Sequence, residues 1–243
     1  MAFWRPTNPA HARYHESVRS PIADLGALNE EVVACRKCPR LVAHREATAR
    51  DKRAMYAGET YWGRPVPGFG DPTARLLVLG LAPAAHGGNR TGRIFTGDRS
   101  GDWLYGALWK AGFANQPESR SRDDGLELHD AWVTAAVRCA PPDNKPKIAE
   151  RDNCEPYLVR EVALLSGLRV VVALGAYAWA AALRVLVPRP RPTPRFGHGA
   201  EATVGSVILL GCYHPSQQNT FTGKLTEPMI DAVFARAREL VSG

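Results

Sequence analysis

The sequence has no hydrophobic run long enough to cross a membrane, and it does not open on an apolar leader. Its longest apolar tract lies between Arg169 and Arg184 and is interrupted by Gly175, whereas a membrane-spanning helix needs roughly 20 apolar residues. The first residues, MAFWRPTNPAHARYHESVRS, are polar and broken by proline, which is unlike a secretory signal peptide. We therefore expect a soluble, cytoplasmic protein that does not bind a membrane.

Two common nucleotide-binding signatures are also missing. The stretch GLAPAAHGGNRTGRIFTGD, residues 80–98, follows the apolar run RLLVLG and is rich in glycine. It has no Gly-Lys-Ser/Thr sequence, which the phosphate loop of nucleoside triphosphatases requires, and GLAPA does not match the dinucleotide fingerprint. The loop is thus typical of a ligand site, but not of one for a nucleoside triphosphate or NAD.

Acidic residues are fewer than basic ones. The 243 residues include 31 Lys and Arg against 24 Asp and Glu, a net charge of +7, which favours a polyanionic partner such as nucleic acid. The length suits one domain, 1–243, with an N-terminal extension at 1–25, and we expect a monomer. The proline- and arginine-rich insert PRPRPTPRFGHG, residues 188–199, predicts a surface loop, or alternatively a loop that contacts a DNA backbone.

Cysteine is sparse, and a cytosolic chain of this kind is not expected to form disulfides. Cys35 and Cys38 have C-x2-C spacing, and Cys139 and Cys154 follow later. Four such thiolates can hold a tetrahedral metal ion or an iron–sulfur cluster, and the spacing does not distinguish the two. The alternative is that Cys139 and Cys154 are small buried residues, which is how we interpret Cys212.

The order of the elements predicts an α/β fold. Continuous apolar runs at 75–80, 131–137, 169–174 and 206–212 indicate strands buried on both faces. Helical patterns lie at 100–112, 157–165, 176–186 and 226–241, the last with Thr226 as its N-cap. Alternating strands and helices indicate a parallel sheet covered by helices.

Three loops leave the carboxyl ends of these strands, where ligands bind in open parallel sheets. They contain residues 80–98, 138–146 and 212–226. Their side chains include the aromatic ring of Phe95, the amides of Asn89 and Asn144, the carboxylate of Asp98 and the imidazole of His214. This set suits a planar, polar heterocycle, and with a basic surface the heterocycle is expected to be a flipped nucleobase.

The motifs GLAPAAHGGNRTGRIFTGD, AVRCAPPDNKP and HPSQQNT together resemble the uracil-DNA glycosylase superfamily, and specifically its family 5, the type B enzymes. The resemblance covers roughly residues 30 to 240. It implies a three-layer α/β/α sandwich around a four-stranded parallel sheet. It also implies hydrolysis of the bond between uracil, or another deaminated base such as hypoxanthine, and its sugar in DNA. The four cysteines resemble the iron–sulfur site of families 4 and 5, which implies a [4Fe–4S] cluster.

The resemblance also assigns roles to residues. His214 resembles the histidine that contacts the departing uracil, and Phe95 the aromatic that stacks on the flipped base. We expect Ala82, His86 and Asn89 to line the base pocket. The loop after His214 is expected to contact DNA through residues from its polar segment: Ser216, Gln217, Gln218, Asn219 and Lys224. Ser216 and Asn219 have a second interpretation, in which they hold the turn of the loop itself.

Two departures from the family pattern affect these roles. No carboxylate stands early in the first motif, so Asp98 and Asn144 become the candidates for positioning water, although Asp98 can equally be the N-cap of the next helix. In the second motif Ala135 stands where family 4 has Asn, which is expected to relax base discrimination. Two rival functions remain at this stage: a non-catalytic iron–sulfur or zinc DNA-binding module, and a hydrolase of small nucleotides.

Overall fold

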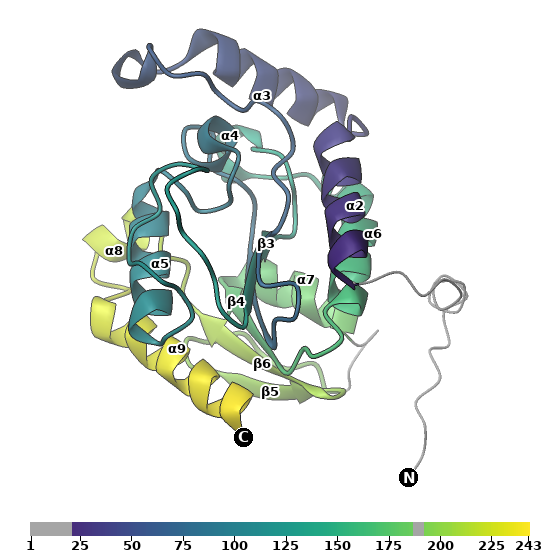
Figure 1. The fold of residues 1–243 in the computed structure, drawn as a ribbon, viewed down its shortest axis with the longest axis vertical. Helices are drawn as coiled ribbons and strands as arrows, with labels where there is room; N and C mark the ends of the chain where they lie inside the picture. The colour runs from purple at the N-terminus through teal and green to yellow at the C-terminus, as the bar shows by residue number, and fades with distance from the viewer. Residues whose placement is uncertain (1–20, 187–191) are drawn as a thin grey trace.

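A sheet lies between two groups of helices in the computed structural model, which describes residues 21–186 and 192–243 (Figure 1). The helices are α2 (Pro21–Ala34), α3 (Pro39–Asp51), α4 (Gly88–Thr91), α5 (Arg99–Lys110), α6 (Ile148–Leu164), α7 (Ala176–Leu186), α8 (Gln217–Phe221) and α9 (Glu227–Ser242), with 3-10 turns η1 (Ala54–Tyr56) and η2 (Pro142–Asn144). The strands are β1 (Phe69–Gly70), β2 (Leu76–Gly80), β3 (Ala131–Ala135), β4 (Val170–Leu174), β5 (Glu201–Val204) and β6 (Val207–Cys212).

The sheet has six strands in the order β1-β3-β2-β4-β6-β5. The four predicted strands are its centre and run parallel, whereas β1 and β5 pair antiparallel at the two edges. The prediction of a four-stranded parallel sheet was therefore incomplete, and the sheet is mixed. The sequence did not reveal the edge strands because β1 has only two residues and β5, EATV, is largely exposed and lacks an apolar run.

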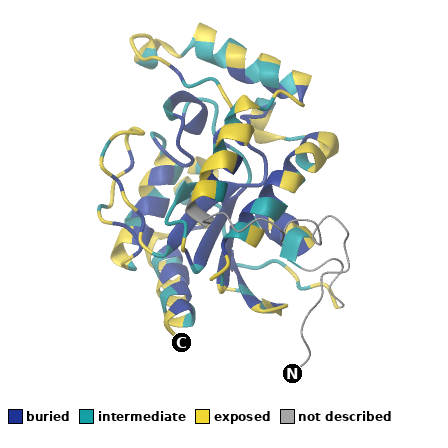
Figure 2. Cartoon of the chain, turned by 45° about the vertical axis from the view of Figure 1, so that its right-hand side comes forward, coloured by how far each residue is buried: buried dark blue, intermediate teal, exposed yellow. Residues whose placement is uncertain are grey.

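Neighbouring residues of each central strand point into two separate cores. Leu76 and Val78 pack with helices α5 and α9, while Leu77 and Leu79 pack with α2, α6 and α7. All five residues of β2 are buried, and the strands lie inside the molecule while the outer helix faces are exposed (Figure 2). Because both faces are covered, the strands have continuous apolar sequences rather than alternating ones.

Helices α5 and α9 begin and end within two residues of the predicted 100–112 and 226–241, and α7 matches 176–186. Helix α6 starts earlier than predicted, at Ile148, so that Cys154 lies inside a helix. Thr226 does occupy the N-cap of α9, but its side chain makes no capping hydrogen bond. The patterns of α2 and α3 were missed.

Helix α2 begins at Pro21, so it overlaps the predicted extension at 1–25, and its Leu25 is buried in the core. Residues 1–20 lie outside the described part of the chain, as do 188–191 of the predicted insert. The described part of that insert, 192–199, contains neither helix nor strand.

Candidate functional site

Phe95 and His214 meet at the carboxyl ends of β2 and β6. Their ring centroids are 5.9 Å apart and the ring planes are tilted by 41°. Phe95 is 5% exposed and has a φ of 52°, a left-handed conformation that is unusual for a bulky residue and is often found at functional sites. The predicted stacking and anion-stabilising residues are thus brought together by the fold.

Two glycines create the space for this pair. A Cβ atom on Gly80, the last residue of β2, would lie 2.6 Å from Cζ of Phe95. Gly175, which has a φ of 94°, follows β4 and donates its amide to the Cys212 carbonyl at 2.8 Å. A Cβ atom on Gly175 would lie 3.5 Å from Cβ of His214. Neither glycine was predicted from the sequence to have a role at the site.

The His214 imidazole is half-buried, and burial lowers its pKa to about 4. It is therefore neutral at pH 7 and can donate or accept one hydrogen bond without carrying a charge. Its backbone is held by the loop, because Asn219 Nδ2 donates to the His214 carbonyl at 2.9 Å.

Asp98 is the N-cap of α5, and its carboxylate accepts a hydrogen bond from the Gly101 amide at 3.1 Å. Burial raises the pKa of this carboxyl, while the amides of Gly101 and Ser100 lower it in part. A Cβ atom on Gly87 would lie 1.9 Å from Oδ2 of Asp98, so the carboxylate rests against the first motif. The N-cap interpretation is confirmed, and it is compatible with a second task at the site.

Asn144 is exposed in η2, with a φ of 55°. It follows β3, so it belongs to the same end of the sheet as Phe95 and His214. Its side chain makes no hydrogen bond to any residue in the described ranges, and thus no contact ties it to Asp98.

Three residues that were expected to line the base pocket contact other parts of the protein: Asn89, His86 and Ala82. Asn89 is 1% exposed and donates to the carbonyls of Arg45 and Ala85, each at 3.3 Å. His86 Nδ1 lies 3.0 Å from the Tyr61 hydroxyl, and Ala82 packs against the core formed around the cysteines. Asn89 thus joins the first motif to Arg45 of α3 as well as to Ala85 of its own loop, and His86 joins it to Tyr61. These contacts hold the first motif in place.

The loop after His214 forms the short helix α8. Ser216 is its N-cap and accepts from the Asn219 amide at 3.3 Å, so the interpretation in which these two residues hold the turn is confirmed. Gln217, Gln218 and Lys224 are exposed.

The same loop also contacts α5 and Tyr213, the residue that follows β6. Phe221 is 69% exposed and lies under the Arg99 guanidinium, which is 4.4 Å from the ring centroid. The Lys224 ammonium lies 5.1 Å from the centroid of Tyr213. Arg99 was not singled out from the sequence, because it stands in no motif and only the fold places it beside this loop.

The four predicted ligand cysteines line one small cavity, which is bounded by the segment between α2 and α3, by α3 itself, by the loop after β3 and by α6. Cys38, Cys139 and Cys154 are buried and none of the four forms a disulfide. Burial raises the pKa of Cys139 to about 12 and that of Cys154 to about 11. The thiols of Cys139 and Cys154 therefore keep their protons at neutral pH.

Buried cations surround this cavity. Arg45, 2% exposed, donates to Sγ of Cys139 at 3.1 Å, and Asn153 Nδ2 donates to Sγ of Cys38 at 3.4 Å. Arg138 also lines the cavity, paired with the buried Glu161, and its Nε is buried without an acceptor. Across 21–186 and 192–243, no three His, Cys, Asp or Glu side chains converge on a site for a single metal ion.

Within those ranges, no helix is both long and apolar enough to span a membrane. Comparison with known proteins adds the family. Residues 67–238 match the model of the uracil DNA glycosylase superfamily. A type-5 uracil-DNA glycosylase of Mycobacterium bovis is 56% identical over 215 residues, which are 88% of this chain and 80% of that protein.

Two further relatives come from other organisms and have lower identities. The type-5 uracil-DNA glycosylase of Thermus thermophilus is 51% identical over 218 residues, 89% of this chain and 98% of that protein. The corresponding protein of Pyrobaculum aerophilum is 47% identical over 206 residues, 85% and 88% of the two chains. With the fold and the Phe95–His214 pair already described, these matches show that the chain belongs to the uracil-DNA glycosylase superfamily and, within it, to the type-5 group.

Proposed function

We propose that this chain is a DNA repair enzyme that hydrolyses the bond between uracil and its sugar in DNA. The observation that carries the proposal is the Phe95–His214 pair at the strand ends, in a chain 56% identical to a type-5 uracil-DNA glycosylase. A flipped uracil would stack on Phe95 with one edge toward His214. Gly80 and Gly175 leave the room in which the Phe95 ring and His214 pack.

His214 would act on the leaving base. Cleavage of the bond gives the base a negative charge, and a hydrogen bond to that charge strengthens as the bond breaks. The low pKa of His214 makes the imidazole a neutral donor. A neutral donor does not trap the uncharged substrate, so its stabilisation is directed to the transition state.

Asp98 and Asn144 would act on the water and the sugar. The Asp98 carboxylate is fixed by its N-cap bond to Gly101, and in its ionised form it would stabilise the positive charge on the sugar. Asn144 has free amide groups on the loop after β3, and we assign it to a water or base contact.

Ala135 supports a wider range of bases. It is the last residue of β3, pairs with Gly80 across the sheet and is 2% exposed. Ala135 therefore lies beside Gly80, against which the Phe95 ring packs. Its methyl group provides no amide that could form a hydrogen bond with the edge of a base. A pocket with fewer polar groups leaves fewer of them unpaired when a different base enters, so we expect deaminated bases such as hypoxanthine to be accepted.

Cys35, Cys38, Cys139 and Cys154 would hold a [4Fe–4S] cluster. The cavity fits such a group: it is lined by four unbridged thiols, and the unpaired Nε of Arg138 is a donor for sulfur. A single zinc ion requires four ligands about 2.3 Å from one point, and a cluster is larger, with its thiolates farther apart. Its contribution would be to tie the α2–α3 segment to β3 and α6.

The metal proposal is tested by iron content. The purified protein should be brown and contain four irons, and Cys35→Ala should lose colour and iron. Cys212→Ala is the control, because Cys212 is also a free thiol but lies in the main core, and it should retain both. A colourless wild type with one zinc would contradict the cluster.

The surface that meets the duplex would be formed by α8 and its neighbours. Phe221, Gln217 and Gln218 are exposed at this loop and could fill the space left by the extruded nucleotide. Arg99 and Lys224 lie beside them on aromatic rings, and each is free to contact a phosphate.

The rival function is a DNA-binding module without catalysis. A uracil-release assay on a labelled duplex separates the two, with an unmodified duplex as the control. Release of free uracil from the first substrate alone supports the glycosylase, and tight binding without release supports the module. Inhibition by free nucleotide but not by duplex would instead indicate a hydrolase of small nucleotides. We also propose that the protein is a cytoplasmic monomer, as a repair enzyme that acts alone would be.

A further inference from the structure

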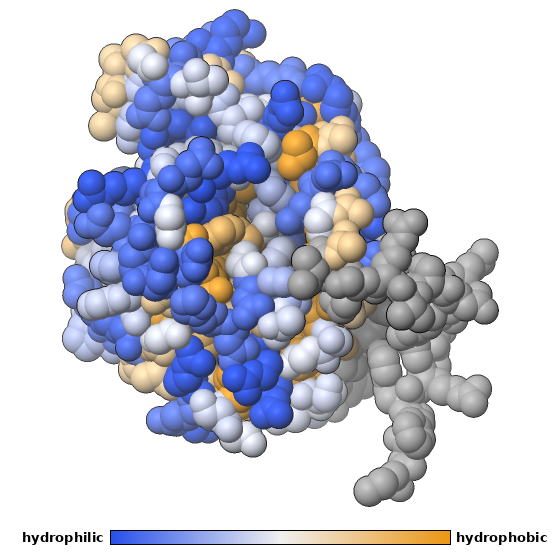
Figure 3. Space-filling view, viewed as in Figure 1, coloured by the Kyte–Doolittle hydropathy of each residue, from blue (hydrophilic) through white to orange (hydrophobic). Residues whose placement is uncertain are grey.

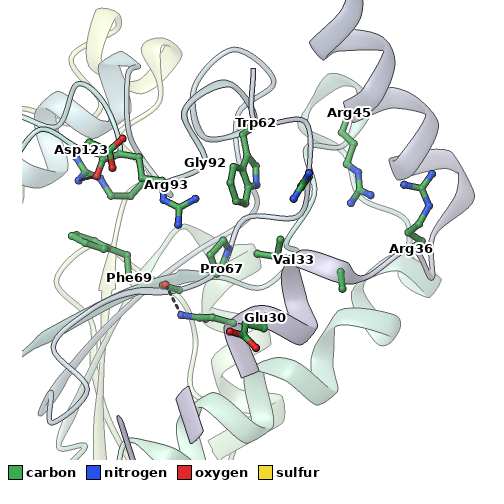
Figure 4. Close-up of a pocket in the computed structure, with 15 residues that line it drawn as sticks. Glu30, Val33, Arg36, Arg45, Trp62, Pro67, Phe69, Gly92, Arg93 and Asp123 are labelled. Carbon is green, nitrogen blue, oxygen red and sulfur yellow. Dashed lines mark hydrogen bonds between the residues drawn. The ribbon is translucent and has the colours of Figure 1, made fainter. Parts of the chain in front are cut away.

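A second cleft of about 720 Å³ lies outside the Phe95–His214 site (Figure 4). It is bounded by α2, the segment before β1, and Gly92–Arg93 of the first motif. Because β1 runs antiparallel to β3, and the Val66 amide bonds to the Arg138 carbonyl at 2.7 Å, this segment lies at the carboxyl ends of the parallel strands. The cleft thus shares an end of the sheet, and one loop, with the candidate active site.

The indole of Trp62 projects into this cleft (Figure 4). Its Nε1 donates to the Pro65 carbonyl at 3.0 Å. A Cβ atom on Gly92, which has a φ of 80°, would lie 2.9 Å from Cδ2 of the indole. The ring is therefore held from one side by backbone, and a ring fixed in this way is a ready stacking surface.

Two exposed cations flank the indole. The guanidinium of Arg122 is 4.7 Å and that of Arg64 5.7 Å from the ring centroid. Neither forms an ion pair with any residue in the described ranges, whereas Arg93 in the cleft floor is paired with Asp124. Arg36 and Arg45 also line the cleft, but both lie beside the carboxylate of Glu46. Among the described residues, the cations of the cleft without an ion pair are therefore the two beside Trp62.

In the wall of the cleft, two buried polar atoms have no hydrogen-bond partner among the residues that the structure describes. They are Nε of Arg45, a donor, and Oδ1 of Asn29, an acceptor. Buried groups of this kind are normally satisfied. Both residues line the cleft together with the apolar Val33 and Pro67. Figure 3 shows apolar residues in the central hollow of this face of the molecule.

We propose that this cleft binds a second nucleotide, distinct from the base held by Phe95 and His214. The base stacks on Trp62 with its polar edge toward Asn29 and Arg45, and the phosphate lies between Arg64 and Arg122. Free nucleotides and a single DNA strand share this chemistry, and a nucleotide of the DNA strand beside the lesion is the form that rests on the proposed function.

The test measures binding of a labelled single-stranded oligonucleotide without uracil, at several salt concentrations. Arg64→Gln/Arg122→Gln should weaken binding at least tenfold and lower the salt slope by about 0.7, since the two arginines share one phosphate and a single strand contributes about 0.7 for each phosphate contact. Trp62→Ala should weaken binding about tenfold, and Trp62→Phe should restore most of the affinity. Arg169→Gln is the matched control, because Arg169 is an exposed cation at the opposite end of β4, and it should bind normally.

Two competitors identify the ligand. Deoxynucleoside monophosphate should displace the oligonucleotide from the wild type, and inorganic phosphate at the same concentration should not. Equal losses in the Arg64/Arg122 double variant and in Arg169→Gln, or equal competition by phosphate, would overturn the proposal. Uracil release is measured separately at saturating DNA, so that an effect on binding is distinguished from an effect on cleavage. A wild type that binds at this cleft but releases no uracil would refute the proposed function and leave the cleft proposal standing.

Discussion

Asp98 combines two tasks that a substitution can separate. It caps α5 through the Gly101 amide, and it lies against the first motif at Gly87. Asparagine is as good an N-cap as aspartate, whereas alanine is a poor one and typically costs about 1 kcal/mol. The charge and the cap can therefore be removed one after the other.

We expect Asp98→Asn to keep the stability of the wild type but to lose most of the cleavage rate, and Asp98→Ala to lose both. Chemical unfolding and single-turnover kinetics on one uracil-containing duplex measure the two effects. If Asp98→Asn cleaves at the normal rate, the residue is a helix cap only, and water positioning passes to Asn144.

His214 is expected to carry the largest single share of the chemistry. Removal of one preorganised donor to a developing anion typically costs on the order of a hundredfold in rate. His214→Ala should therefore lose at least that in single turnover, with little change in affinity for uracil-containing duplex. Near-normal turnover in this variant would shift the main role to Asp98.

The pH dependence of stability reports on the same imidazole. The pKa of His214 falls from 6.5 to about 4 on burial. Because the folded-state pKa is lower than the unfolded one, the folded state binds fewer protons in this range, and stability falls as the pH falls from 6.5 through about 4. The stability of the wild type should therefore fall relative to that of His214→Gln as the pH is lowered through this window. Parallel curves would show that the imidazole is exposed and not desolvated.

At the scale of elements, α5 contains two glycines that the structure distinguishes. A Cβ atom on Gly101 would lie 1.9 Å from the Phe95 carbonyl oxygen, and one on Gly106 would meet nothing within 4 Å. The first turn of α5 thus packs directly on the backbone that gives Phe95 its left-handed conformation. The approach of helix to loop positions the aromatic ring of the site.

The matched pair Gly101→Ala and Gly106→Ala tests this packing. Gly106→Ala should stabilise the protein by about 0.5–1 kcal/mol, because alanine is the better helix former. Gly101→Ala should destabilise it and slow base release, since Phe95 must move. Thermal unfolding and uracil release are measured for both variants, and similar behaviour of the two would contradict the described contact.

At the scale of the molecule, the charge of +7 bears on how the protein finds its substrate. Each phosphate neutralised by a cation adds about 0.9 to the salt dependence of duplex binding. Affinity for duplex should therefore fall at least about tenfold between 50 and 200 mM salt, and Lys224→Gln should lower the slope by about one. A flat dependence would argue against DNA as the substrate.

Local patterns were enough to predict the four central strands and most of α5, α7 and α9. The apolar runs are long because the sheet is covered on both faces, and each run therefore carries its own signal. The motifs around Phe95, Asp98 and His214 can likewise be recognised from the sequence, because they lie in loops that follow these strands. What lacks an apolar run, such as the two-residue β1 or the exposed β5, gives no such signal.

The sequence by itself determined the family, the central strands and the residue types of the candidate site. Only the tertiary structure decided which of those residues meet: Phe95 with His214, but Asn89 with the Arg45 carbonyl and His86 with Tyr61. It also placed Arg45 and Arg138 beside the cysteines, and Trp62 between two arginines. The physical reason is that these contacts join segments far apart in the chain, so that no local pattern encodes them, and packing of the whole molecule selects them.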